Sequence, residues 1–300
     1  MLDLGLRDAD GFIASFLLPG QDGEWTVVET GPTPSLPRLE RGIAEAGIDP
    51  TRVSRVLVTH IHLDHAGGAG SVLSRFPKAR LYVHSAGVAH LLDPSRLLAS
   101  ARRAWGSASD ALWGTVESVA PSRIVALSGG EHLPLAEGAI DAIATPGHAS
   151  HHLSFFDSAT HALMTGDSAG VRLEGAWRPR PAIPPPELDL ELLFYSLERM
   201  AELAPRELWY THFGPAPNAR QQFQEYRRAV TEWRDAGLET AVHNPSIESI
   251  AHALETAENR AAVRAGIPNR GTDNRDILSA YTMAAQGLLR YFRKKGLVSQ

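Results

Sequence analysis

The order of apolar and polar positions divides the chain into two parts. In the first two-thirds, short apolar runs end at Gly, Pro or Asp, as buried strands do. Helical spacing separates some of these runs, over residues 36–46 and 69–76 and around Leu193, Leu197 and Met200. Residues 85–121 have a mixed pattern of helix and loop. We predict an α/β fold with strands over residues 11–18, 24–29, 53–58, 80–83, 123–127, 140–145, 152–157, 162–165 and 207–210.

Beyond Pro217 the pattern is helical throughout. A shorter helix is expected over residues 246–264, between two longer amphipathic ones. The apolar faces of the longer helices carry Phe223, Tyr226, Val230 and Trp233 in one case, and Ile277, Tyr281, Ala284, Leu288 and Tyr291 in the other. We therefore predict a mixed α/β domain at residues 1–217 and an all-helical extension at residues 218–300. A proline-dense connector at residues 179–186 is expected to be extended.

Composition and charge narrow the classes of function. The 300 residues carry a formal net charge of −5 without a basic block, so neither nucleic acid nor a membrane is expected as a partner. The absence of Cys excludes thiolate nucleophiles and leaves imidazole and carboxylate as the metal ligands. No apolar run reaches about 18 residues, and the first residues lack a signal-peptide pattern. A soluble cytoplasmic protein is expected.

The highest concentration of potential metal ligands lies in the segment from Thr59 to His65, directly after a predicted strand. Its three histidines and one aspartate would be costly to bury without partners. The alternate spacing of His60 and His62 turns both rings the same way from an extended backbone. Asp64 and His65 follow the turn and can face a second point nearby. This arrangement favours two metal ions, and the helix-borne HExxH pattern of a single zinc site is absent.

Three more candidate ligands follow short apolar strands further along the chain. They are His148 in Thr-Pro-Gly-His, Asp167 in Gly-Asp, and His212 in Thr-His. Each precedes small or turn residues, so each side chain can project from a sheet edge into a shared cleft.

Together these residues resemble the metallo-β-lactamase superfamily, whose H-x-H-x-D-H motif and later His, Asp and His are all matched in order. The resemblance implies a four-layer αββα sandwich with a binuclear centre at one edge of its sheets. It also implies that His60, His62 and His148 bind one metal, that Asp64, His65 and His212 bind the other, and that Asp167 bridges both.

This resemblance implies a hydrolase that cleaves an ester, thioester or lactone of a small molecule with a metal-bridging hydroxide. Two divalent metal ions are expected, zinc first, with iron or manganese as alternatives. Asp64 is the expected catalytic residue, because it can bind metal and orient the nucleophile or pass a proton. The substrate-binding residues stay unassigned, and a homodimer stays an open alternative.

Departures from individual branches of the family leave the substrate open. Lactonases usually have Tyr where this chain has Gly170, and the segment that follows the bridging Asp in glyoxalase II enzymes is missing. The Trp177-Arg178-Pro179 segment and the helical tail are more similar to the quinolone-signal effector thioesterase. The alternatives from other classes are an oxygenase resembling persulfide dioxygenases, with one iron, and a regulator that keeps the fold without catalysis.

Several residues near the motifs are expected to play supporting roles. His152 is predicted to be structural or to lie behind the ligands. Glu29 is predicted to be a turn carboxylate, with a role behind the ligands as the alternative. Trp105 and Trp113 favour packing of a lid over direct substrate contact. Tyr195 and Phe213 are further residues that could line the cleft.

Overall fold

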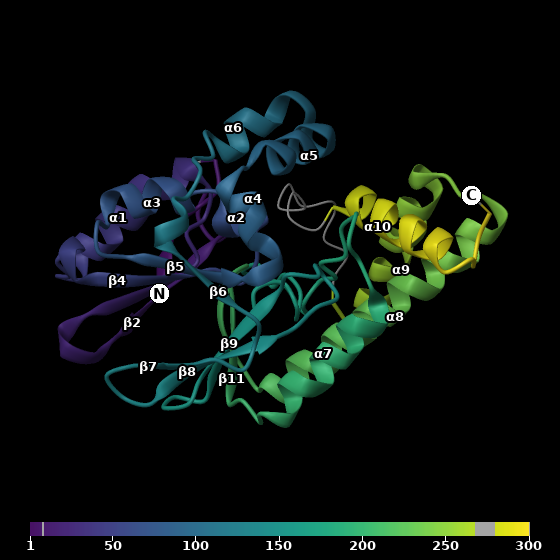
Figure 1. Ribbon diagram of the computed structural model, residues 1–300. Helices are drawn as coiled ribbons and strands as arrows, with labels where there is room; N and C mark the ends of the chain where they lie inside the picture. The colour runs from purple at the N-terminus through teal and green to yellow at the C-terminus, as the bar shows by residue number, and fades with distance from the viewer. Residues whose placement is uncertain (8, 268–279, 300) are drawn as a thin grey trace.

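A computed structural model describes residues 1–7, 9–267 and 280–299, and it contains two six-stranded sheets that face each other (Figure 1). The first sheet has the order β1-β2-β3-β4-β5-β6, from Leu2–Asp3, Ala14–Pro19, Trp25–Val28, Val53–Leu57, Arg80–His84 and Ile124–Leu127. The second has the order β12-β11-β10-β9-β8-β7, from Gly214–Pro217, Glu207–Tyr210, Ala162–Met164, Leu153–Asp157, Ala139–Ala144 and His132–Pro134.

Alternation along the strands explains why helices cover the outer face of each sheet. Val28 and Leu57 point to a core between the sheets, where Phe155 and Met164 of the second sheet meet them. Their neighbours Val27 and Val56 point the other way, into a core shared with α1 (Leu36–Glu45) and α3 (Ala69–Arg75). On the far side, Leu163 and Leu208 pack against α7 (Leu190–Glu202). The order is therefore helices, sheet, sheet, helices, which confirms the predicted αββα sandwich.

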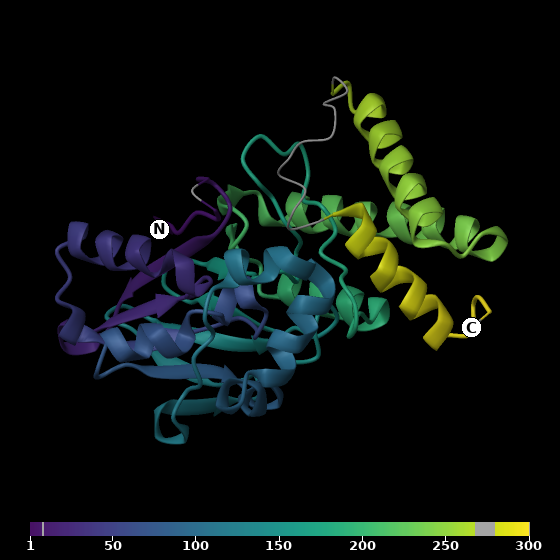
Figure 2. The same cartoon turned by 90° about the horizontal axis from the view of Figure 1, so that it is seen from above.

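The remaining helices lie at one end of the sandwich (Figure 2). Short helices follow β4 and β5, namely α2 (Leu63–Ala66), α4 (Val88–Leu92), α5 (Ser95–Trp105) and α6 (Ser109–Trp113). The C-terminal segment forms α8 (Ala219–His243), α9 (Ile247–Arg264) and α10 (Tyr281–Lys294). These three helices share one apolar core with α7 and β11. The helical extension is thus confirmed, while the boundary at residue 217 stays a prediction, and Ile277 lies outside the described residues.

The sequence pattern did not predict three strands, and each of them is a short strand at the edge of its sheet. β1 has two residues, β7 ends at Pro134, and β12 contains Pro215 and Pro217. Proline lacks the N–H that a central strand needs, so a strand that contains it is stable mainly at an edge. Among the described helices, none has the length and hydrophobicity required to cross a bilayer.

A glycine fixes how α10 sits on the proline-dense connector. A Cβ at Gly287 would lie 2.0 Å from the carbonyl oxygen of Ile183, which is backbone and has little room to move. At Gly237, the matched helical glycine of α8, a Cβ would meet the flexible end of Leu288 at 3.1 Å.

We therefore expect Gly287→Ala to lower the free energy of unfolding by about 1–3 kcal/mol. Gly237→Ala should stay within about 1 kcal/mol of the wild type, because the gain in helix propensity offsets a small side-chain shift. Urea denaturation of both variants measures the difference, and equal values would contradict the close contact of α10 with the connector.

Candidate metal centre

The candidate ligands meet because four strands end at the same edge. β8 and β10 are each antiparallel to β9, and β10 is parallel to β11, so β8, β10 and β11 all run in one direction. His148, Asp167 and His212 follow the carboxyl ends of these strands. The segment from His60 to His65 follows β4 in the other sheet and begins helix α2. The site therefore draws side chains from both sheets.

One group of imidazoles consists of His60, His62 and His148. The Nδ1 atom of His62 lies 2.8 Å from Nε2 of His60 and 2.9 Å from Nε2 of His148. Burial, followed by the neighbouring histidines, holds the pKa of both His60 and His62 well below the usual value. These two rings are therefore neutral at pH 7 and offer lone pairs to a cation.

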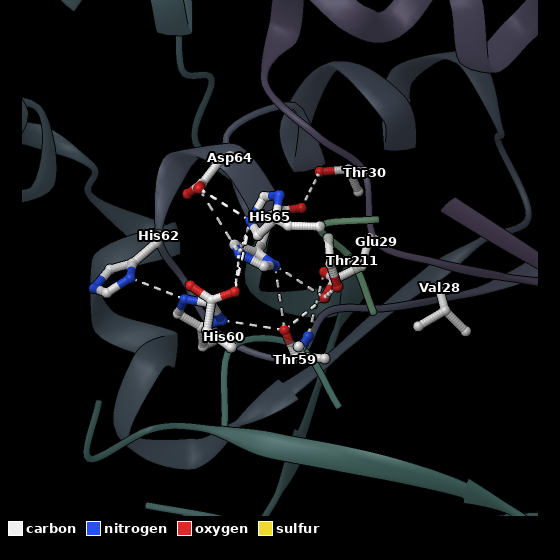
Figure 3. Close-up of polar contacts among 12 residues, drawn as sticks. Val28, Glu29, Thr30, Thr59, His60, His62, Asp64, His65 and Thr211 are labelled. Atoms are coloured by element: carbon white, nitrogen blue, oxygen red, sulfur yellow. Dashed lines mark hydrogen bonds and ion pairs between the residues drawn. The ribbon is translucent and has the colours of Figure 1, made fainter. Parts of the chain in front are cut away.

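A second group consists of Asp64, His65 and His212, and most of it can be followed in Figure 3. The Nε2 atoms of the two histidines are 3.2 Å apart, and Asp64 Oδ2 lies 3.4 Å from that of His212. Burial raises the pKa of Asp64, but His65 and His212 outweigh this effect and bring it to about 2. Burial lowers the pKa of His65, whereas Glu29, Asp167 and Asp64 together hold it well above the usual value. A cation that bound at this group would therefore have to displace a proton from His65.

Asp167 lies between the two groups and turns one oxygen toward each. Its Oδ2 lies 3.5 Å from Nε2 of His148, and its Oδ1 lies 3.5 Å from Nε2 of both His65 and His212. The Oδ1 atom is buried and has no hydrogen-bond partner among the described residues. A buried carboxylate oxygen without a donor is costly unless a cation neutralises it. The donor set is thus able to hold metal ions, and this carboxylate is within reach of both groups.

Hydrogen bonds on the outer nitrogens aim the rings at the centre. His148 Nδ1 donates to the carbonyl oxygen of Ala182 at 2.9 Å, and His212 Nδ1 donates to that of Phe12 at 2.6 Å. A carbonyl can only accept, so each Nδ1 carries the proton and Nε2 keeps its lone pair when the ring is neutral. Such bonds behind the ligands fix ring orientation and raise ligand basicity.

Glu29 holds three parts of the site together, so its prediction as a turn carboxylate is wrong. Its side chain is fully buried and accepts hydrogen bonds from His65 Nδ1 at 3.0 Å, Thr59 Oγ1 at 2.5 Å and Thr211 Oγ1 at 3.2 Å (Figure 3). Its φ of +69° is unusual for a residue other than glycine. Thr59 and Thr211 each precede a candidate ligand, and this repeated Thr-His pair is the signal in the sequence that could have identified Glu29.

We expect Glu29→Gln to weaken metal affinity by about 10- to 100-fold, because His65 loses the carboxylate behind it. A competitive titration with a chromogenic chelator measures this change. Asp141→Asn removes a carboxylate 2.6 Å from His132 on the surface and is the matched control. Equal affinities for the two variants would contradict the role of Glu29.

His152 supports the segment that carries Asp167, as its predicted structural role requires. Its Nε2 accepts the Asp167 N–H at 3.1 Å, and its Nδ1 lies 2.9 Å from the hydroxyls of Thr145 and Ser168. Burial and then His148 lower its pKa well below the usual value, so the ring stays neutral.

A cavity of about 250 Å³ opens onto His62, Asp64, His148 and Asp167. Trp105 and Trp113 both line it, with ring centroids 5.7 Å apart. Tyr195 is largely exposed on α7, and Phe213 packs against the cores on either side of the first sheet. Neither is among the residues that line the cavity.

Comparison with known proteins gives consistent results. A family model described as the metallo-beta-lactamase superfamily matches residues 9–212. A metallo-beta-lactamase fold-containing protein of Sulfurisphaera tokodaii is 30% identical over 166 residues, which cover 54% of this chain and 61% of that protein. A thioesterase of Emericella nidulans is 26% identical over 150 residues, with 47% and 34% covered. The chain therefore spans less than two-thirds of the length of either relative.

Solved structures show the same fold. A metallo-beta-lactamase family protein of Thermus thermophilus superposes with a TM-score of 0.67 at 23% identity, covering 95% of this chain and 89% of that one. A structure of a superfamily protein from Sulfolobus tokodaii gives a TM-score of 0.63 at 24% identity, with 73% and 81% covered.

Proposed function

Because this chain belongs to the metallo-β-lactamase superfamily, we propose that it is a hydrolase that uses two divalent metal ions. Its substrate in this proposal is an ester, a thioester or a lactone of a small molecule, and zinc is the first choice of metal. The supporting observation is the position of Asp167, with one carboxylate oxygen toward each imidazole group.

In this proposal each predicted ligand would bind one cation or both. His60, His62 and His148 would hold one cation, while Asp64, His65 and His212 would hold the other. Their donor atoms in each group lie within 4.8 Å of one another. Asp167 would contribute to both sites.

The chemistry follows from the donor set and from the protonation of its members. Bound divalent cations supply Lewis acidity and lower the pKa of a coordinated water to about 7. Asp64 stays ionised near neutral pH, because its pKa is about 2, and its carboxylate can orient the attacking water or accept its proton. Asp64 is therefore the proposed catalytic residue. No Ser or Cys nucleophile is needed.

The similarity to a thioesterase of Emericella nidulans supports an acyl substrate over a phosphoryl one. The cavity beside Asp64, whose lining is mostly apolar, supports a small molecule over a polymer. An oxygenase with a single iron would leave Asp64, His65 and His212 without a cation, although they lie as close together as the other group.

Metal analysis combined with a substrate panel tests the proposal. We expect about two metal ions per chain, and hydrolysis of at least one class among esters, thioesters and lactones without oxygen consumption. One iron per chain, with oxygen uptake on a persulfide, would instead establish the oxygenase. Failure of every panel member with fully loaded protein would favour a regulator.

A further inference from the structure

Helix α5 turns an incompletely covered apolar face toward the candidate metal centre. Leu97, Ala101 and Trp105 repeat every four residues and line the cavity that opens onto Asp64 and His148. They pack against the neighbouring core, yet no residue of α5 is fully buried. An amphipathic helix in a folded core normally buries this stripe, so the uncovered face leaves room for an apolar ligand.

The opposite wall of the cavity is also mainly apolar, although Glu187 after the connector lines it as well. It is formed by the connector around Ile183 and Pro184 and by Met283 and Ala284 of α10. Helices α5 and α10 are far apart in sequence and approach this region from different sides (Figure 1). Because Gly287 has no side chain, α10 can approach the carbonyl oxygen of Ile183 closely, and this backbone contact holds the wall in place.

We propose that the slot between α5 and the connector binds the apolar acyl half of the substrate. The scissile carbonyl would then lie at Asp64 and Asp167, which line the same cavity. This inference rests on the proposed hydrolase function and specifies its substrate class. The ligand is an acyl group without charge, linear or aromatic, bonded through its carbonyl carbon to oxygen or sulfur.

The volume of the cavity limits the size of this group. At about 250 Å³, the cavity can bury an acyl chain of limited length only. Burial of each methylene contributes about a fourfold gain in affinity. Selectivity should therefore rise steeply with chain length and then level off or fall when the slot is full.

The experiment uses the full metal-loaded chain and thioesters of one thiol, from acetyl to tetradecanoyl, with a benzoyl thioester for the aromatic case. In parallel, calorimetry measures binding of the matching straight-chain carboxylates, which need no hydrolysis. Ala101→Phe narrows the slot, Leu97→Ala widens it, and Ala99→Phe changes the exposed side of the same helix as a control. Thermal unfolding midpoints verify that each variant is folded.

We expect kcat/KM and carboxylate affinity to rise about fourfold per methylene up to a limit. Ala101→Phe should lower both at least about tenfold for the longest chains that the wild type accepts. Leu97→Ala should move the limit to longer chains, and Ala99→Phe should leave it unchanged.

The outcomes separate this inference from the proposed function. Binding that follows chain length without any hydrolysis would support the slot and overturn the hydrolase. Hydrolysis that is indifferent to chain length, or equally affected by the two phenylalanine variants, would overturn the slot and leave the hydrolase in place. Flat carboxylate binding to the wild-type protein alone would also overturn the slot.

Discussion

Replacement of Asp167 by alanine is expected to remove bound metal and hydrolytic activity together, with a loss of activity on the order of a thousandfold. The reason is that this carboxylate faces both imidazole groups, at 3.5 Å from His148 and from His65. Its removal takes one negative charge from both proposed cation sites at once. His62→Ala should also lose metal and activity, because it removes the imidazole whose Nδ1 lies close to both His60 and His148.

Metal content and initial rates on the same samples measure this effect. Asp157→Ala is the matched control, because Asp157 is also a buried aspartate but accepts its hydrogen bonds from the turn at Ala159 and Thr160. That variant should lose stability and keep its metal ions. Full turnover by metal-depleted Asp167→Ala would refute the proposed role of Asp167.

Arg178→Ala is expected to lower the free energy of unfolding by about 3–5 kcal/mol, because it removes the counter-charge of the buried Glu258 carboxylate. The guanidinium is almost fully buried and donates to Glu258 at 2.6 and 3.3 Å and to Glu232 at 2.7 Å. Trp233 Nε1 also donates to Glu258, at 3.1 Å. This network fastens the loop after Asp167 to both α8 and α9.

Urea denaturation of metal-free protein isolates this effect from metal binding. Arg227→Ala is the control, because Arg227 pairs with Glu198 at the surface and its loss should cost less than about 1 kcal/mol. A difference between the two variants below that value would contradict a central role for Arg178. Arg178→Lys should recover only part of the loss, since an ammonium cannot reproduce the two-pronged contact with Glu258.

Much of the candidate centre could be predicted because each segment that carries candidate ligands follows an apolar strand. His60 follows β4, and His148 and His212 follow β8 and β11, so strand prediction alone places these side chains at sheet edges. Their order along the chain then indicated the family. The αββα layers followed from the same resemblance.

Other features depend on contacts that a linear pattern does not contain. The role of Glu29 required Thr59 and Thr211, which are 152 residues apart in sequence (211 − 59), to meet at one carboxylate. Strand β12 escaped because Pro215 and Pro217 argue against a strand until its edge position is known. The apolar wall opposite α5 comes from residues beyond 180, and no local periodicity joins it to Trp105.

Each group of candidate ligands takes side chains from both sheets, and this affects the thermal stability of the protein. His60 and His62 follow a strand of one sheet and His148 follows a strand of the other. Asp64 and His65 likewise come from the first sheet's side and meet His212 from the second. Each cation would thus link the two sheets of the sandwich through its ligands. At a free metal concentration of a hundred times Kd, one bound cation adds about 2.7 kcal/mol to the free energy of unfolding. Removal of the metal ions by a chelator should therefore lower the melting temperature of the whole protein and also abolish the proposed hydrolytic activity.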